Sequence, residues 1–338
     1  MPSSQFNLDM FQVPMHDLGL KADQLKGILT VGYDENEIKN YMSDYYYDEA
    51  NVQNQSYNLV ESYKSVFRKA LARVRKYEKI ETALELGAGF GSGTYAMASI
   101  ETNCKIYATE LSTAMLIRHK REGEDKFPQF ENRIVRCQVN ADEQVFKDES
   151  FDLVFGTAIL HHVFEPLSVI KEAGRLLKPN GIAIFCEPFE PGYALLRIAY
   201  EILLHYESNK RFPFKYFSLT RPQRNYLLHC ISVWNANRVD MPHSKDDLKN
   251  LDDKWIFPYE YFDETARESG FDNIVKMSNI PRGGNHIERL YNTHTTGNNI
   301  TLPPIGLEIV KIIDRAFSRP QLECMPHDGV LVLQKRID

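Results

Sequence analysis

Short apolar segments alternate with amphipathic segments along the middle of the chain. Residues 55–78 place apolar side chains at spacings of three and four, which predicts a helix. Runs of five to eight apolar-rich residues then alternate with stretches of helical periodicity. This alternation predicts right-handed crossovers and a mostly parallel sheet with helices on both faces. The expected strands are 82–87, 105–111, 132–139, 150–156 and 182–187, and the expected helices are 92–101, 112–123 and 166–181.

The alternation stops after residue 187, and two long segments interrupt the last part of the pattern. Residues 190–257 are rich in aromatic and charged side chains, and residues 281–325 form a second interruption. Strands are expected at 272–278 and 328–336, with a helix ahead of the first of them. We therefore expect an α/β fold, a doubly wound sheet of seven strands. Residues 1–54 would form an N-terminal helical cap, and residues 55–338 one domain with lid insertions at about 190–257 and 281–325.

A glycine-rich turn, ALELGAGFGSGT, follows the first of these strands. Gly87, Gly89 and Gly91 have the spacing GxGxG, whereas a dinucleotide fingerprint needs GxGxxG. Glu85 precedes the turn, and its charge would repel a pyrophosphate held at the next helix. The same charge would attract a cation, and S-adenosylmethionine (SAM) carries a sulfonium and an ammonium group but no phosphate. The sequence thus favours SAM over a dinucleotide.

The stretch LELGAGFGSG resembles the first motif of the class I SAM-dependent methyltransferases, and the similarity extends over about residues 80–190. The resemblance implies that Glu110 binds the ribose hydroxyls, for which two carboxylate oxygens suit a cis-diol. It also implies that Asn140 or Asp142 contacts adenine, and the sequence leaves that choice open. SAM would be the cofactor and S-adenosylhomocysteine (SAH) the product. The expected cofactor-binding residues are Glu85, Gly87, Ala88, Gly89, Gly91, Glu110, Leu111, Asn140, Ala141, Asp142, Thr157 and Tyr46.

Candidate catalytic groups stand at the carboxyl ends of two strands. Methyl transfer needs alignment above all, and a base only where the acceptor holds its proton tightly. His161 and His162 follow the fourth strand, where open α/β folds bind ligands, and Glu187 ends the fifth. We expect these three to be the catalytic residues. The alternative is that the histidines pack against the cofactor and that Glu187 only lines the pocket.

Two regions could close over the acceptor. A tyrosine-rich stretch before the core supplies Tyr47, and the second insertion supplies Arg282, His286 and Tyr291. We expect these four to bind a small-molecule substrate, although a solvated loop would explain the second insertion equally well. An oxygen acceptor is the leading expectation. N- or carboxyl-methylation, and a SAM-binding protein that is regulatory or does not methylate, stay open.

Charge and composition narrow the partners. The net charge of −6 and the pI near 6.0 argue against nucleic acid as a partner. We expect no membrane span, because the sequence holds no apolar run of about 18 residues. Five dispersed cysteines and a start without a secretory signal favour a cytoplasmic location. No metal site is expected from the His and Cys spacing. The oligomeric state cannot be read from the sequence, and a homodimer stays open.

Overall fold

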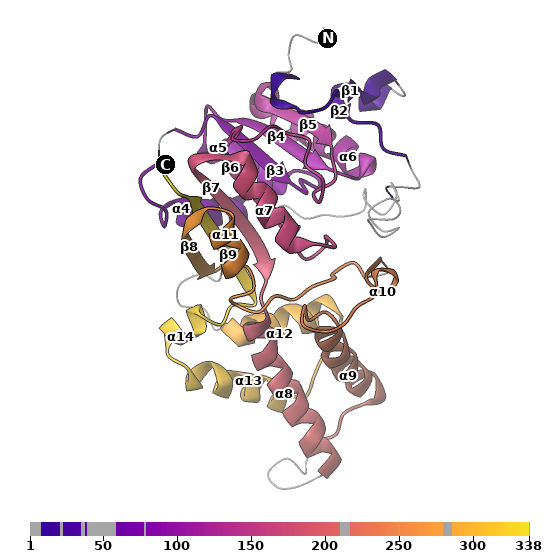
Figure 1. Ribbon diagram of the computed structural model, residues 1–338. Coiled ribbons are helices and arrows are strands. Elements are labelled where there is room, and N and C mark those ends of the chain that lie inside the picture. Colours follow the sequence, from indigo (N-terminus) through magenta and orange to yellow (C-terminus); the bar gives the residue numbers. More distant parts are fainter. Residues whose placement is uncertain are drawn as a thin grey trace.

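The structure is a computed structural model that describes residues 8–20, 23–34, 38, 59–77, 79–209, 217–249, 251–279 and 286–337. One nine-stranded sheet runs through this part of the chain in the order β1-β2-β5-β4-β3-β6-β7-β9-β8 (Figure 1). Pairing is parallel from β2 to β7, while β9 is antiparallel to both β7 and β8, and β1 is antiparallel to β2. The strands are β1 His16–Asp17, β2 Ile28–Thr30, β3 Thr82–Leu86, β4 Lys105–Glu110, β5 Ile134–Gln138, β6 Phe151–Thr157, β7 Leu177–Pro188, β8 Phe271–Ser278 and β9 Asp328–Lys335.

The helices that follow the parallel strands cover both faces of the sheet, as the alternating pattern predicts. Two clusters of buried apolar side chains occupy these two faces. The α-helices are α4 Val60–Leu71, α5 Ser92–Ile100, α6 Thr113–Lys126, α7 Pro166–Leu176, α8 Glu190–Asn209, α9 Arg221–Ala236, α10 Lys245–Lys249, α11 Asp263–Glu268, α12 His286–Gly297, α13 Pro304–Ala316 and α14 Arg319–Glu323. Short 3-10 helices are η2 Leu8–Met10, η3 Leu18–Leu20, η4 Asp23–Leu25 and η5 Pro128–Arg133.

The α/β architecture is confirmed, but the expectation of seven strands is corrected. The N-terminal segment adds β1 and β2 to the edge beyond β5. Ile28 and Leu29 of β2 are buried there, so a short apolar run gains both a covered face and backbone partners on β5. Residues 8–34 of the expected helical cap therefore hold strands and 3-10 helices, while Ile38 is helical. Tyr46 and Tyr47 lie outside the described residues.

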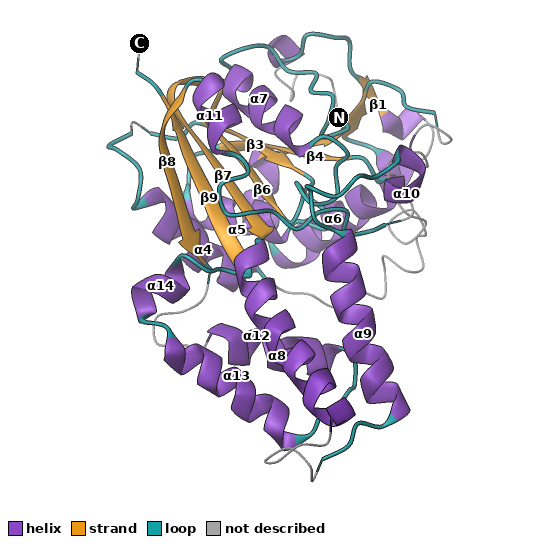
Figure 2. Cartoon of the chain, turned by 60° about the horizontal axis from the view of Figure 1, so that its bottom comes forward, coloured by secondary structure: helices purple, strands orange, loops and turns teal. Residues whose placement is uncertain are grey.

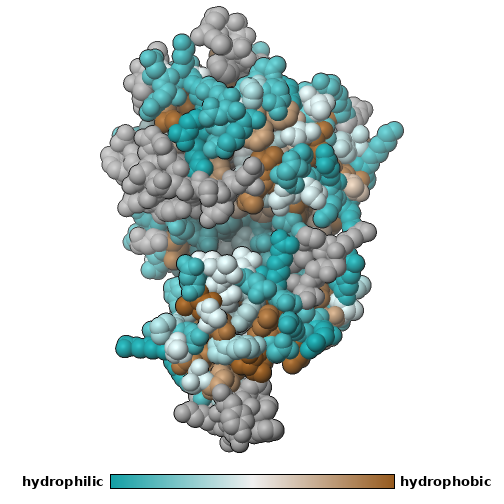
Figure 3. Space-filling model, turned by 180° about the vertical axis from the view of Figure 1, so that it is seen from behind, coloured by the Kyte–Doolittle hydropathy of each residue, from teal (hydrophilic) through white to brown (hydrophobic). Residues whose placement is uncertain are grey.

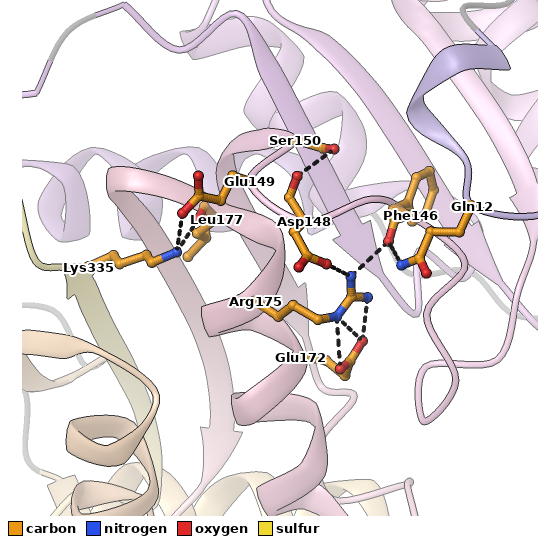
Figure 4. Close-up of polar contacts among 9 residues, drawn as sticks. All are labelled: Gln12, Phe146, Asp148, Glu149, Ser150, Glu172, Arg175, Leu177 and Lys335. Carbon is orange, nitrogen blue, oxygen red and sulfur yellow. Dashed lines mark hydrogen bonds and ion pairs between the residues drawn. The ribbon is translucent and has the colours of Figure 1, made fainter. Parts of the chain in front are cut away.

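The N-terminal segment is also held to the core by polar contacts (Figure 4). The side-chain amide of Gln12 donates to the carbonyl of Phe146, and Arg175 of α7 donates to the same carbonyl at 3.0 Å. Arg175 is oriented by Glu172, one turn earlier in α7, with Nε–Oε distances of 3.1 Å. These contacts connect the edge of the sheet to the helix that follows β6.

The two insertions pack against each other at one end of the sheet (Figure 2). Helices α8, α9 and α10 come from the first insertion, and α12, α13 and α14 come from the second. Helix α8 contacts α9, α12 and α13, and these helices share one apolar cluster that is separate from the two clusters of the sheet. We call the four helices α8, α9, α12 and α13 the lid. The lid stands at the end of the sheet where β7 runs into α8, which is the carboxyl edge of the parallel strands (Figure 1).

Candidate active site

The glycine turn after β3 forms one wall of a cavity. Gly87, Gly89 and Gly91 have φ of +63°, +52° and +99°, a conformation that glycine adopts far more readily than other residues. The turn is held to β4, because the N–H of Ala88 donates to the carbonyl of Thr109 at 2.8 Å. The space beside it, the first cavity, has a volume of about 270 Å³. Expected cofactor residues that line the first cavity are Gly87, Ala88, Gly89, Glu110, Leu111, Asn140, Ala141, Asp142 and Thr157.

Glu110 is fixed at the end of β4 by the backbone around it. Its two carboxylate oxygens accept N–H groups of Gly89 and Ser112, each at 3.0 Å. Burial raises the pKa of Glu110, although these hydrogen bonds oppose the rise. The carboxylate thus ties the glycine turn to the following helix at the floor of the first cavity.

Two buried polar atoms without a partner lie on residues at the end of β5. They are Nδ2 of Asn140, a donor, and Oδ1 of Asp142, an acceptor. Burial raises the pKa of Asp142 to about 6, against its ordinary value near 4. Since buried polar groups are nearly always hydrogen-bonded, this donor and acceptor indicate that a polar ligand completes the first cavity.

Glu85 does not line the first cavity. It lies behind the glycine turn and is 0% exposed, because alternation along β3 turns Glu85 and Ala83 to the face of the sheet opposite Leu84 and Leu86. Its Oε2 accepts a hydrogen bond from the Thr94 hydroxyl, while Oε1 is buried without a partner. Burial raises the pKa of Glu85 to about 8. Glu85 therefore lies behind the turn, and its expected role in cofactor binding stays a prediction.

A second cavity, of about 520 Å³, lies between the carboxyl edge of the sheet and the lid. It shares Leu59, Tyr63 and Ala158 with the first cavity, so the two spaces meet at these side chains. From behind, the surface is hollowed where the sheet meets the lid helices (Figure 3). Ala158 has φ of +58°, a strained conformation for alanine, just after β6. Lid residues that line the second cavity include Tyr193, Tyr226, His229, Trp234, Arg289 and His294.

His161 stands in the second cavity between two carboxylates. Its Nδ1 lies 2.6 Å from Oε2 of Glu187 and its Nε2 lies 3.5 Å from Oδ1 of Asp253. Glu187 is held in turn by the backbone N–H groups of Ile159 and Leu160, at 3.0 and 2.9 Å. Burial alone would lower the pKa of His161, but the two carboxylates raise it to about 9. The expected pair of His161 and Glu187 is thus brought together.

His162 lines the first cavity, whereas His161 lines the second, although their ring centroids are only 4.1 Å apart. Nδ1 of His162 donates to the carbonyl of Asp252 at 2.7 Å, and burial together with neighbouring His161 lowers its pKa. His161, His162 and Asp253 offer metal-ligand atoms within 4.8 Å of one another. The Nδ1 of His162 carries the ring proton in its hydrogen bond to a carbonyl, so Nε2 is the ring nitrogen of His162 that keeps a lone pair.

A segment of the first insertion, residues 251–257, closes over both cavities and was missed at the sequence level. It is hydrogen-bonded to the loop after β6. The N–H of Lys254 donates to the carbonyl of His161, and the indole of Trp255 donates to the carbonyl of Val163, both at 2.8 Å. Asp252 and Lys254 line the first cavity, while Asp253 and Trp255 line the second. In the sequence, the charged run DDK at residues 252–254 was the signal that could have indicated a functional role for this segment.

The expected substrate residues do not gather at the second cavity. Tyr291 is packed inside the lid against Tyr200, with ring centroids 6.3 Å apart, and His286 is also buried and lines neither cavity. Arg289 and His294, from the same helix α12, line the second cavity instead. Arg282 lies outside the described residues.

Comparison with known proteins shows that this chain is similar to methyltransferases. Residues 84–185 match the family model described as "Methyltransferase domain". The chain is 31% identical over 126 residues to a demethylmenaquinone methyltransferase of Clavibacter sepedonicus, covering 37% of this chain and 48% of that protein. It is 27% identical over 132 residues to a malonyl-[acyl-carrier protein] O-methyltransferase of Marinomonas sp. (strain MWYL1), covering 39% and 47%. The chain thus spans about half the length of these curated relatives.

Among solved structures, similarity is found with Haemonchus contortus phosphoethanolamine N-methyltransferase 2 in complex with S-adenosyl-L-methionine. The identity is 14% and the TM-score 0.47, covering 89% of this chain and 60% of that one. In the described part of the chain, no helix combines the length and the apolar character that crossing a bilayer requires. The family match spans β3 to β7, the strands that carry the glycine turn, Glu110 and His161. Residues 84–185 of this chain are therefore similar to a methyltransferase domain.

Proposed function

We propose that this protein transfers the methyl group of SAM to a hydroxyl of a small molecule bound in the second cavity. The observation that carries the proposal is the meeting of two cavities at Leu59, Tyr63 and Ala158, with His161 beside that junction. One cavity is bounded by the glycine turn and the other by the lid. Such an arrangement lets two ligands approach each other while protein covers both.

The residues of the first cavity suit SAM. Asn140 offers an unpaired donor and Asp142 an unpaired acceptor, which match the acceptor nitrogens and the amino group of an adenine. Glu110 lines the same cavity, where a carboxylate suits a ribose diol. Ionised Asp142 and Glu110 also suit a cationic ligand. When bound, SAM supplies a methyl group on a positively charged sulfur, ready for in-line displacement.

His161 is the group best placed to take a proton from the acceptor. Its Nδ1 is occupied by Glu187, so Nε2 faces the second cavity and is the atom that can accept a proton. Glu187 orients the ring and stabilises the imidazolium that forms, because it is itself fixed by three backbone N–H groups. Asp253 lies next to Nε2, and its side chain is 68% exposed, towards the cavity.

An amine acceptor is the second candidate. The rings of Tyr193, Trp234 and His294 meet edge to face with centroids 5.4–5.9 Å apart, and each ring comes from a different lid helix. Asp328 also lines the second cavity, and its pKa is lowered because His327 and nearby cations outweigh burial. Aromatic rings beside a carboxylate are a favourable environment for an ammonium group.

The test is to incubate the protein with methyl-labelled SAM and a panel of hydroxylated, amine and carboxylate metabolites, and to follow SAH and labelled product. We expect label on oxygen. His161→Gln should lower turnover by about 10²–10⁴-fold, the range for loss of a general base. His205→Gln is the matched control, because His205 is an exposed imidazole on α8 that lines neither cavity. Full activity of the His161 variant, or label only on nitrogen or carboxylate, would reject the hydroxyl mechanism.

A further inference from the structure

A buried polar network runs from Glu85 away from the first cavity to the edge of the molecule. It consists of Glu85, Thr94, His119, Arg136 and Glu131, and we call it the Glu85 network. We propose that Thr94, His119 and Arg136 are positioning residues that hold the carboxylate of Glu85 behind the glycine turn and thereby set the affinity for SAM. The inference rests on the proposed function, since it assumes that SAM occupies the first cavity.

The members of the network are joined by a continuous series of hydrogen bonds. The Thr94 hydroxyl on α5 contacts Oε2 of Glu85, and His119 Nε2 on α6 lies 2.8 Å from that hydroxyl. Arg136 Nε on β5 lies 2.7 Å from His119 Nδ1. Arg136 also meets Glu131 with an N–O distance of 2.7 Å. Glu85, Thr94 and His119 are all 0% exposed.

The direction of every bond in the series follows from Arg136. A guanidinium group can only donate, so Nδ1 of His119 must accept and Nε2 must carry the ring proton. Nε2 therefore donates to Thr94, whose own hydroxyl proton is left to point at Glu85. Burial and the charge of Arg136 lower the pKa of His119, which keeps its ring neutral and consistent with this order. The network thus delivers one directed hydrogen bond to the Glu85 carboxylate.

The network also touches the glycine turn directly. A β-carbon on Gly91 would lie 2.9 Å from the His119 ring, and one on Gly93 would lie against Oε1 of Glu85. No side chain fits between the turn and the network at either position. The His119 ring and the Glu85 carboxylate therefore pack closely against the backbone of Gly91 and Gly93, which adjoins the turn that bounds the first cavity.

The charge of Glu85 gives the network a measurable effect. Burial and the neighbouring Glu110 raise the pKa of Glu85, whereas the Thr94 hydrogen bond lowers it, leaving a value of about 8. Cationic SAM favours the ionised form, so its affinity should increase as the pH rises through about 8. Loss of the Thr94 bond disfavours the ionised form. It should weaken binding at pH 7 and move the increase to higher pH.

The experiment is calorimetric titration of SAM and SAH into the full chain between pH 6 and 9.5, with thermal melting of each variant. Thr94→Val and His119→Leu remove the directed hydrogen bond, and we expect SAM to bind about tenfold more weakly at pH 7. His119→Gln keeps one acceptor and one donor and should restore most of the affinity. Ser99→Ala is the control, because Ser99 lies on the same helix as Thr94 and its hydroxyl donates to the carbonyl of Tyr95 at 2.6 Å, outside the network.

Unchanged SAM affinity and an unchanged pH profile in Thr94→Val and His119→Leu would overturn the proposal, even if both variants melt earlier, since a purely structural network would do that. If His119→Leu does not fold, Thr94→Val, which is nearly isosteric, decides alone. Failure of the proposed function looks different. In that case the unaltered protein itself does not bind SAM, or binds it and forms no SAH with any acceptor.

Discussion

Asp253→Asn should move the pH dependence of methyl transfer to lower pH. His161 can act as a base only when its ring is neutral, and its pKa of about 9 keeps it protonated at neutrality. At pH 7 about one ring in a hundred is neutral. We therefore expect kcat/KM of the unaltered protein to rise with pH and to level off near 9.

The size of the shift follows from the charge that is lost. Asp253 Oδ1 lies 3.5 Å from Nε2 of His161, and an opposite charge at that range changes a pKa by about one to three. Removing it should bring the pKa of His161 from about 9 to about 6–8. At a value of 7, half of the rings are neutral at pH 7, an increase of about fiftyfold in the base form.

The assay is SAH formation at saturating SAM with the acceptor concentration varied, which gives kcat/KM for the acceptor from pH 5.5 to 10. The position of the rising limb is the informative quantity, because Asp253 can also contact the acceptor and so alter the height of the profile. Asp252→Asn is the matched control, since that neighbour lines the first cavity. A rising limb that keeps its position in Asp253→Asn would refute the assignment of His161 as the base.

Four further outcomes can be measured. Gly91→Ala should lower stability by about 1–3 kcal/mol, because φ is +99° and a β-carbon would lie 2.5 Å from the Tyr95 ring; Gly297→Ala, with open space around it, is the control in thermal melting. Asn140→Leu should weaken SAH binding at least about tenfold in calorimetry by removing an unpaired donor of the first cavity. Trp234→Ala should raise KM for the acceptor while leaving the SAH dissociation constant unchanged, with exposed Leu228→Ala as its control. The charge of His161 should stabilise the fold fully below about pH 6.5 and lose this effect as the pH rises through about 9, so His161→Gln should narrow the difference between melting temperatures at pH 6.5 and 9.5.

The sheet and the first cavity could be predicted from sequence because both follow local patterns. Strand alternation, helical periodicity and the GxGxG spacing are properties of adjacent residues, and they placed β3 to β7 and nine expected lining residues of the first cavity. One error had a local cause as well. β2 is only three residues long, too short for a period to show.

The second cavity could not be predicted in the same way, because its walls come from segments far apart in the chain. His161 meets Glu187 through parallel pairing of β6 and β7, which sequence order suggests. Its other partner, Asp253, arrives from the first insertion. In α12, helical periodicity alone does not say which face meets α8 and α13, so Tyr291 was expected in the cavity that Arg289 and His294 in fact line.

The 251–257 segment contributes side chains to both cavities. Asp252 and Lys254 line the first cavity, while Asp253 lines the second. The backbone of the segment is tied on one side to the His161 carbonyl and on the other to Asn237 at the end of α9. The same stretch of backbone therefore connects the loop after β6 with the end of α9, and it carries side chains that line both cavities.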